Sequence, residues 1–345
     1  MGVYRAAVVG CGRMGGFIDD EIGFDHTCLL PFSHAAGYVE SPHTELVAGC
    51  DANEEKLAAW GERYGVKALY TSVTAMVDEQ HPDFVSICTP TPPRCETALA
   101  VLAGKPKAIW IEKPMAETLR DCDRMIEAAR EVGAVIAHNT SRRWHPIWWR
   151  AREIIEQDWI GPVHHVTGWC GGGISHMGSH LLDTVLLLVG SDVEWVTGHA
   201  HDQEKLAGED DLGLIGFLHF VSGAHAYVNM VDPPWRFECE VAAERGRIRL
   251  WNNGAEVELE MMAGEGSARR MYERPFPRPA RMTASPVTLI ADLVHCVEHG
   301  GQPRANGETG RTVLEIALAM RESARQSSTP VPLPFADLDA AIRSV

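Results

Sequence analysis

A glycine-rich turn near the N-terminus restricts the possible folds of this chain more than any other feature. The residues from Gly10 to Gly15 read Gly-Cys-Gly-Arg-Met-Gly and follow directly after an apolar run at 6–9, which is typical of a buried strand. In such a turn the first glycine permits a sharp reversal, the second lets the backbone approach a pyrophosphate, and the third lets a helix pack closely on the strand. The N-terminus of that helix offers free N–H groups to the phosphates. The pattern therefore predicts a strand–turn–helix unit that binds a dinucleotide.

The first 140 residues alternate short apolar runs with amphipathic stretches. Strands are expected at 6–9, 45–50, 68–70, 84–88, 108–111 and 134–137, and helices at 53–64, 73–79, 95–103 and 119–132. Strands that alternate with helices pair in parallel through right-handed crossovers. We therefore expect a doubly wound α/β domain over residues 1–140.

Beyond residue 140 the pattern changes. Helices are expected at 148–157, 176–189, 287–299 and 310–325, strands at 163–169, 212–221, 224–230, 237–242 and 247–250, and a loop at 267–285. Long strands that follow one another without helices between them predict a large, mostly antiparallel, open sheet. Residues 141–345 are therefore expected to form a second α/β domain.

The composition excludes several classes of function. Hydrophobic residues make up 45% of the chain, but 31 Lys and Arg against 47 Asp and Glu give a net charge of −16. Because so acidic a chain repels phosphate backbones and anionic bilayers, we expect neither a nucleic-acid partner nor a membrane partner. The nine cysteines are scattered without a CxxC pair, which is typical of free thiols in a cytoplasmic protein. Because the first strand is expected to begin close to Met1, we expect no signal peptide.

An acidic residue follows the second expected strand. Asp51 stands where a carboxylate can accept hydrogen bonds from the ribose of an adenine dinucleotide. Because this carboxylate would repel a 2′-phosphate, and no arginine follows closely, NAD is favoured over NADP. Asp51 comes 36 residues after Gly15, where about 20 are usual, which indicates an insertion at 18–33. His26, Cys28 and His34 suggest metal ligands there, but a lid or packing loop is favoured and we expect no metal.

Four features, in this order along the chain, carry a resemblance to a known family. They are the glycine turn, Thr89-Pro90 after the fourth strand, Glu112-Lys113-Pro114 after the fifth, and a Gly-Ser-His-Leu-Leu-Asp run at 178–183. Together they span the chain from its start to about residue 190. In motif order and spacing the chain resembles the Gfo/Idh/MocA family, named for glucose–fructose oxidoreductase and inositol dehydrogenase.

The resemblance implies an N-terminal Rossmann domain and a C-terminal α/β domain whose open sheet serves substrate binding and oligomerisation. It also implies a nicotinamide cofactor, oxidation or reduction at a secondary carbinol of a sugar or polyol, and assembly into a homodimer or homotetramer. By the family pattern, Lys113 and His180 are the catalytic pair. The residues expected to bind the cofactor are Gly10, Gly12, Arg13, Met14, Gly15, Asp51, Thr89, Pro90, Glu112 and Lys113.

The chemistry of these residue types agrees with those roles. Hydride transfer from a carbinol carbon requires that the hydroxyl proton leave, and a histidine with a pKa of about 6.5 can accept it near neutrality. A lysine ammonium close to the same oxygen stabilises the developing alkoxide. Lys113 follows an expected strand at its carboxyl end, where open α/β sheets place ligands.

Two positions depart from the family pattern. Where an aspartate usually stands four residues before the histidine, this chain has His176, which would share a helix face with His180. His176 is a candidate for binding a substrate hydroxyl or relaying the proton, or it caps the helix. A two-histidine metal site is disfavoured because no third ligand has suitable spacing. The histidine that often follows the Thr-Pro turn is replaced by Cys95, for which a buried inert thiol is favoured over a catalytic one.

The segment at 139–146 is expected to leave the sixth strand at the junction of the domains. Arg143 matches an arginine that family members often carry near the cofactor or substrate, and it would bind an anionic sugar group or form an interdomain salt bridge. Trp144 is a candidate for stacking on a sugar ring. Tryptophans four residues apart, such as Trp144 and Trp148, are however more often part of a core.

Three functions are therefore open. The favoured one is an NAD-dependent dehydrogenase of a sugar or polyol, with Lys113 and His180 activating the hydroxyl. The second is a redox-neutral lyase or glycosidase that keeps NAD tightly bound and oxidises its substrate transiently. The third is a non-catalytic protein that binds NAD or a sugar, against which the intact Glu112-Lys113-Pro114 motif and His180 argue.

Overall fold

The computed structural model describes residues 2–23, 25, 27–231, 236–264 and 266–344. The chain divides into two compact units, and each is described by itself. The first comprises residues 1–144 and 283–311, and the second comprises residues 145–282 and 312–344. The domain boundary expected at residue 140 thus lies close to residue 144, where the chain first passes from the first unit to the second. The chain also returns to the first unit at 283–311.

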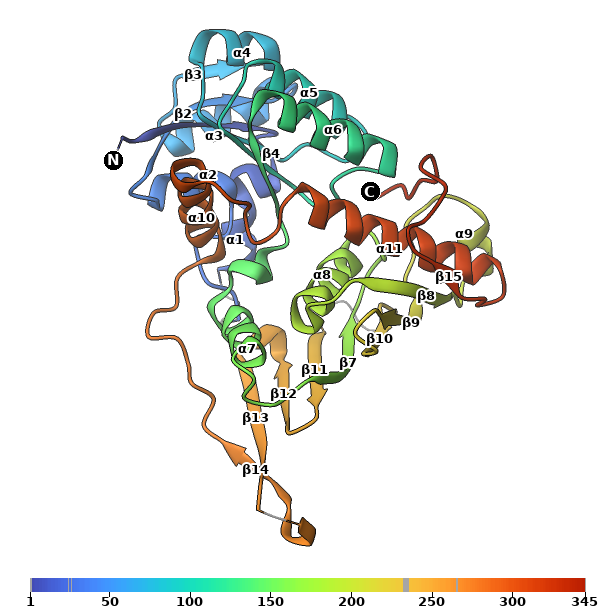
Figure 1. Cartoon of the computed structure of the whole chain (residues 1–345). Helices are drawn as coiled ribbons and strands as arrows, with labels where there is room; N and C mark the ends of the chain where they lie inside the picture. Colours follow the sequence, from blue (N-terminus) through green and yellow to red (C-terminus); the bar gives the residue numbers. More distant parts are fainter. Residues whose placement is uncertain (1, 24, 26, 232–235, 265, 345) are drawn as a thin grey trace. The chain divides into compact units, whose positions relative to one another are not determined.

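The first unit contains, within its described residues, a six-stranded parallel sheet in the order β3-β2-β1-β4-β5-β6. Figure 1 labels β2, β3 and β4 of this sheet. Its strands are β1 (Tyr4–Val9), β2 (Thr44–Cys50), β3 (Ala68–Tyr70), β4 (Phe84–Ile87), β5 (Ala108–Ile111) and β6 (Val135–His138). This order confirms the doubly wound sheet. It reverses between β1 and β4, and ligands of such sheets bind outside the carboxyl ends of the strands at this switch point.

Local sequence signals fix most helices of this unit. These are η1 (Arg13–Phe17), α1 (Ile18–Ile22), α2 (His34–Glu40), α3 (Glu54–Tyr64), α4 (Val73–Gln80), α5 (Arg94–Ala103), α6 (Leu119–Val132), η2 (Ser141–Trp144) and α10 (Ser285–His299). Asn53 and Thr118 accept a hydrogen bond from the first turn of α3 and α6 respectively, as N-caps do. Gly65 and Gly133 end these helices in the left-handed conformation. The segment after the glycine turn begins with a π-helical turn, η1, and becomes α-helical only at Ile18.

The second unit contains, within its described residues, a nine-stranded sheet in the order β14-β13-β12-β11-β7-β10-β9-β8-β15. Its strands are β7 (Val163–Cys170), β8 (Val193–His199), β9 (Ile215–Phe220), β10 (His225–Asn229), β11 (Phe237–Ala243), β12 (Gly246–Trp251), β13 (Glu256–Ala263), β14 (Arg270–Arg274) and β15 (Val331–Pro332). Only β7 and β10 pair in parallel among these described strands, so the expectation of a mostly antiparallel sheet is confirmed.

Helices cover one face of this second sheet. The unit contains α7 (Pro146–Glu156), α8 (Met177–Val189), α9 (Gln203–Ala207) and most of α11 (Gly307–Arg325), and short helical turns lie at η3 (Asn252–Gly254) and η4 (Gly266–Ala268). The apolar helix α8 packs on β7, β10 and β11. Alternate residues of these strands, such as Val166 and Val228, are completely buried, whereas Trp169 and Tyr227 on the other face are partly exposed. This alternation is typical of a sheet with one face on the core.

One expectation about this unit is wrong. The stretch at 267–285 contains the edge strand β14 rather than only a loop. All five residues of β14 are exposed, so the strand has no buried apolar alternation that a sequence pattern could reveal. Its pairing with β13, from Leu259 opposite Arg274 to Ala263 opposite Arg270, is what defines it as a strand.

Candidate active site

The glycine turn has the geometry that a dinucleotide requires. Gly10 has a φ of +92°, and a Cβ there would lie 2.7 Å from the carbonyl carbon of Cys88. A Cβ on Gly15 would overlap the backbone of Gly10, whereas a Cβ on Gly12 would meet nothing within 4 Å. The first and third glycines are therefore needed for close packing, and the second leaves open space beside the backbone, where a pyrophosphate can approach.

Asp51 lies directly beside this turn. One of its carboxylate oxygens accepts a hydrogen bond of 2.8 Å from the backbone N–H of Cys11, and the other accepts one of 2.8 Å from Asn53. Beneath the turn, the buried Trp60 donates its indole N–H to the carbonyl of Gly15 at 3.1 Å. The insertion therefore does not displace Asp51 from the turn, because β1 and β2 are neighbours in the sheet.

The two residues inside the turn, Arg13 and Met14, face different surroundings. Arg13 is exposed, and its guanidinium forms an ion pair of 2.6 Å with Glu21 of α1. Met14 is partly buried. In the insertion, the carboxylate of Asp19 accepts hydrogen bonds from the backbone of Phe32 and Ser33, which ties the end of the insertion to its beginning.

The turns that follow β4 and β5 meet the glycine turn at the same edge of the sheet, because β1, β4 and β5 are parallel neighbours. Thr89 follows β4, and the partly exposed Lys113 follows β5. Buried Arg94 links these two turns, since its guanidinium donates to the carbonyls of Thr89, Glu112 and Pro114. Burial lowers the pKa of Arg94 to about 10, so it stays charged at neutral pH.

A buried hydrogen-bond network holds the carboxylate of Glu112 in place. His34 Nε2 lies 2.9 Å from Glu112 Oε1, and His34 Nδ1 lies 2.9 Å from Ser86 Oγ. Ser86 in turn donates to the hydroxyl of Tyr38, and Asn139 donates its amide N–H to Glu112 Oε1. The other carboxylate oxygen of Glu112 accepts the backbone N–H of Lys113 at 3.2 Å. The network therefore fixes the backbone from which the Lys113 side chain projects.

The charges of this network follow from burial and from neighbouring groups. Burial raises the pKa of Glu112, but its hydrogen bond to His34, together with the charges of Lys113 and Arg94, lowers that pKa to about 2. Burial lowers the pKa of His34, and its hydrogen bond to Glu112 opposes that effect. Glu112 is therefore an ionised carboxylate, and the imidazole of His34 stacks on Trp110 with ring centroids 3.5 Å apart.

Two polar side chains at this edge have buried atoms whose hydrogen-bonding capacity is not used. Thr89 Oγ1 and both ring nitrogens of His138 are buried without a hydrogen-bond partner among the described residues. Buried polar groups are nearly always satisfied in native proteins, so such atoms indicate a bound group. With the open space at Gly12 and the carboxylate of Asp51, they show that the carboxyl edge of this sheet fits a dinucleotide.

In the second unit, the partly exposed carboxylate of Asp211 holds the backbone at the start of α8. Asp211 accepts backbone N–H groups from Ser175 and His176, each at 2.9 Å, and a Cβ on Gly173 would overlap this carboxylate. Burial raises the pKa of Asp211, and the backbone hydrogen bonds oppose that effect. Asp211 thus places a carboxylate at the backbone of His176, the position where the family pattern has an aspartate.

His176 and His180 lie on this organised segment. The helix begins at Met177, one residue later than expected, and His176 occupies the N-cap position without a side-chain capping bond. His176 is exposed and His180 is partly buried in the first turn. His176 is thus the N-cap residue of α8, although its side chain accepts no capping hydrogen bond, and its two roles toward a substrate stay predictions.

Other expected residues belong to the packing of the first unit. Trp144 is completely buried, and its indole N–H donates to Asp292 at 2.9 Å, which places this ring in the core and not where a sugar can stack on it. Arg143 donates to the carbonyl of Arg304 at 3.0 Å. The thiol of Cys95 is buried, and burial raises its pKa to about 12, as expected of an inert cysteine.

The sequence pattern did not reveal Arg94, Asp211 or the role of His34. Each acts through a hydrogen bond to a distant part of the chain, so no local periodicity marks it. Within the described residues, no group of three or more His, Cys, Asp or Glu side chains is arranged to hold a metal ion. His26, considered as a ligand, lies outside the described residues.

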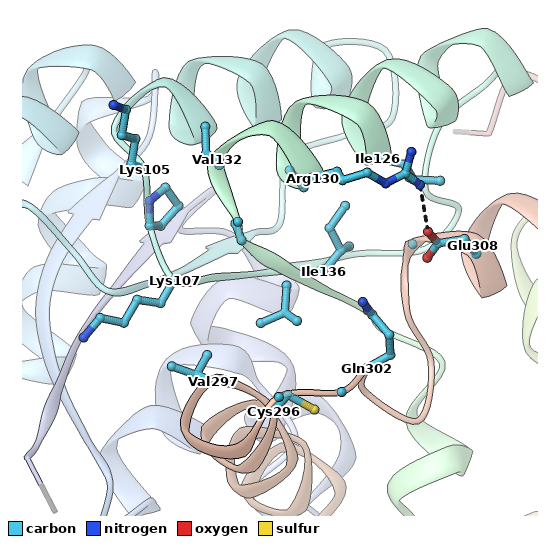
Figure 2. A pocket seen from close by; sticks show the side chains of 18 residues that line it. Lys105, Lys107, Ile126, Arg130, Val132, Ile136, Cys296, Val297, Gln302 and Glu308 are labelled. Atoms are coloured by element: carbon cyan, nitrogen blue, oxygen red, sulfur yellow. Dashed lines mark ion pairs between the residues drawn. The ribbon is translucent and has the colours of Figure 1, made fainter.

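A pocket of about 590 Å³ lies elsewhere in the first unit, against α6 and α10 (Figure 2). It is lined by Val135 and Ile136 at the start of β6, and Figure 2 shows an ion pair between Arg130 and Glu308 at its side. Because β6 begins here, this pocket lies at the amino edge of the sheet. The residues of the glycine turn and Lys113 do not line it.

Comparison with known proteins decides the family. Residues 4–140 match the Gfo/Idh/MocA model described as an oxidoreductase family with an NAD-binding Rossmann fold, and residues 135–333 match the C-terminal alpha/beta domain model of the same family. The chain belongs to the Gfo/Idh/MocA oxidoreductase family. The resemblance expected from four short motifs therefore extends over both domains.

Family members of similar length act on sugars and polyols. The chain is 24% identical to D-apiose dehydrogenase of Paraburkholderia graminis, covering 94% of this chain and 89% of that protein. It is 25% identical to myo-inositol 2-dehydrogenase of Thermotoga maritima, covering 92% and 96%. Levoglucosan dehydrogenase, solved with NADH and L-sorbose, has the same fold with a TM-score of 0.80 at 19% identity, covering 97% and 100%. No helix among the described residues has the length and apolar character needed to cross a membrane.

Proposed function

We propose that this family member is an NAD-dependent dehydrogenase that oxidises a secondary hydroxyl of a sugar or polyol, or reduces the corresponding ketone. The observation that carries the proposal is the carboxyl edge of the first sheet. There Lys113 follows β5 on a backbone fixed by buried Glu112, beside the turns that follow β1 and β4. A lysine so placed is suited to a reaction at a ligand bound on this edge.

The proposed roles of the side chains follow from their chemistry. A bound nicotinamide accepts or supplies the hydride. Lys113 lowers the pKa of the substrate hydroxyl and stabilises the developing alkoxide, while His180 removes the hydroxyl proton. His176 binds a substrate hydroxyl or passes the proton on, and Arg143 binds an anionic group of the substrate.

The remaining cofactor contacts are proposed from the same edge. The backbone at Gly12, Arg13 and Met14 binds the pyrophosphate, and Thr89 and Pro90 line the nicotinamide side. Asp51 accepts hydrogen bonds from the adenosine ribose, which favours NAD over NADP because its carboxylate repels a 2′-phosphate.

The proposal includes a compartment and an assembly. All nine cysteines, each within the described residues, are free thiols, which supports a cytoplasmic location. Copies of the chain associate into a homodimer or homotetramer, supported by the partly exposed face of the nine-stranded sheet.

The experiment combines the purified protein with NAD and a panel of aldoses, inositols and sugar acids, and follows NADH absorbance together with substrate loss. We expect NADH to form with at least one substrate. The Lys113→Ala variant should lower kcat by about 10²-fold or more with little change in NAD affinity, whereas the exposed Lys67→Ala control should not.

Other outcomes would contradict the proposal in distinct ways. Substrate loss without accumulation of NADH would favour the redox-neutral lyase or glycosidase. NAD binding without turnover across the panel would favour a non-catalytic binding protein. A Lys113→Ala variant with the wild-type rate would remove Lys113 from the mechanism.

A further inference from the structure

The segment at 267–282, which we call the arm, differs in charge from the rest of the chain. It carries five arginines, at positions 269, 270, 274, 278 and 281, against the single acid Glu273. The arm therefore has a net charge of +4. Because the whole chain has a net charge of −16, the rest of the chain has a net charge of −20. In Figure 1, β13 and β14 extend beyond the other strands of the second unit.

The arginines of the arm are not paired with carboxylates in the part of the chain that the structure describes. None of the five forms an ion pair with a carboxylate of the described residues. The neighbouring strand β12 is different, because Arg247 pairs with Glu260 at 2.6 Å and Arg249 pairs with Glu240 at 3.0 Å. Five uncompensated cations in so acidic a chain indicate a surface that meets carboxylates from elsewhere.

Large apolar side chains accompany these charges. Met271, Tyr272 and Met282 are 41%, 48% and 43% exposed, and Met262 on the adjacent β13 is 38% exposed. Arginine, methionine and tyrosine are the residue types enriched at the centres of protein interfaces. A strand that only needed protection from edge-to-edge aggregation would carry charges without this apolar surface.

We propose that the arm docks on the acidic surface of a second copy of this chain. The charges are complementary, since an arm of +4 meets a body of −20. Direct pairing of two β14 strands is disfavoured, because an antiparallel pair centred on Tyr272 would set Arg270 opposite Arg274 of the other copy. The arm therefore binds through its side chains, with arginines on carboxylates and the apolar residues covered by the contact.

The test measures self-association by sedimentation velocity over a range of protein and salt concentrations. We expect the wild-type protein to associate, and to associate more weakly as salt rises. The Arg274→Glu/Arg278→Glu variant should weaken association by about 10-fold or more. The matched control, Lys56→Glu/Lys67→Glu, changes the net charge equally at exposed positions of the first unit and should retain wild-type association.

A photocrosslinking residue at position 271 gives a second, independent readout. It should form a bond to an acid-rich peptide of another copy, and the Arg274→Glu/Arg278→Glu background should reduce that yield. A monomeric wild-type protein, equal association of the arm variant and the wild type, or an arm that binds an oligonucleotide instead would each overturn the proposal. The proposal does not depend on the reaction: loss of NADH formation alone would leave it standing, and loss of association alone would leave the dehydrogenase function standing.

Discussion

His34 Nε2 and Glu112 Oε1 lie 2.9 Å apart in the interior of the first unit, with side-chain exposures of 0% and 5%. The two residues are 78 positions apart in the sequence. Glu112 is ionised, and its second oxygen accepts the backbone N–H of Lys113. Through Glu112, the imidazole of His34 thus helps to fix the turn that contains Lys113, the proposed catalytic lysine.

Replacing His34 with Leu should destabilise the protein by about 2 to 4 kcal/mol, because the buried, charged Glu112 would lose its hydrogen bond to His34. The free energy of unfolding from urea denaturation measures this loss. The His164→Leu variant, which changes an exposed histidine on β7, is the control and should unfold like the wild type. Equal stability of the His34 variant would show that the pair does not hold the turn.

Replacing Asp51 with Asn should reduce the preference for NAD over NADP by about 10-fold or more, because the carboxylate no longer binds the ribose as strongly or repels a 2′-phosphate. Asn retains an oxygen that can accept the N–H of Cys11. Dissociation constants for both dinucleotides, from fluorescence titration, give the ratio. The exposed Asp202→Asn variant should leave it unchanged, and an unchanged ratio in the Asp51 variant would remove Asp51 from cofactor selection.

Replacing Asp211 with Asn should lower kcat by about 10-fold or more. Ser175 and His176 donate to different carboxylate oxygens, and the amide nitrogen that replaces one of them is a donor, which cannot accept a backbone N–H. The affinity for NAD should stay the same, since this carboxylate lies in the second unit. Steady-state kinetics and NAD titration separate the two effects. The exposed Asp210→Asn variant is the neighbouring control, and a wild-type kcat in the Asp211 variant would contradict its positioning role.

Acid should destabilise the protein partly through His138. Burial lowers the pKa of His138 to about 3; Glu112 opposes this effect, and Arg94, Arg143 and Lys113 add to it. An unfolded histidine titrates at about 6.5, so the unfolded chain binds more protons below that pH, and stability is lost as the pH falls from about 6.5 towards 3.

The loss attributable to His138 between pH 7 and pH 5 is about 2 kcal/mol. His138→Leu should therefore lose about that much less stability over this interval than the wild type, as measured by urea denaturation at both pH values. His164→Leu should follow the wild type. Parallel losses in the wild type and His138→Leu would show that His138 does not titrate in this way.

Local patterns were sufficient to predict most of the architecture. The period of apolar residues, the capping residues and the glycine turn are short-range properties, so they predicted the alternation of strands and helices and the doubly wound sheet. β3, from Ala68 to Tyr70, and α6, from Leu119 to Val132, lie at the expected residues. The strand β14 was not predicted, because all its residues are exposed and do not alternate between buried apolar and exposed polar side chains.

By its motifs alone, the sequence determined that the glycine turn, Asp51 and Lys113 follow strands of one parallel sheet, and thus that they share its carboxyl edge. Only the tertiary structure decided what holds these groups in place: His34 behind Glu112, Arg94 across two turns, and Asp211 at the start of α8. It also decided between the two interpretations of Trp144, whose ring lies in the core. The physical reason is that a hydrogen bond between residues many tens of positions apart depends on strand order and packing, which leave no trace in the spacing of neighbouring residues.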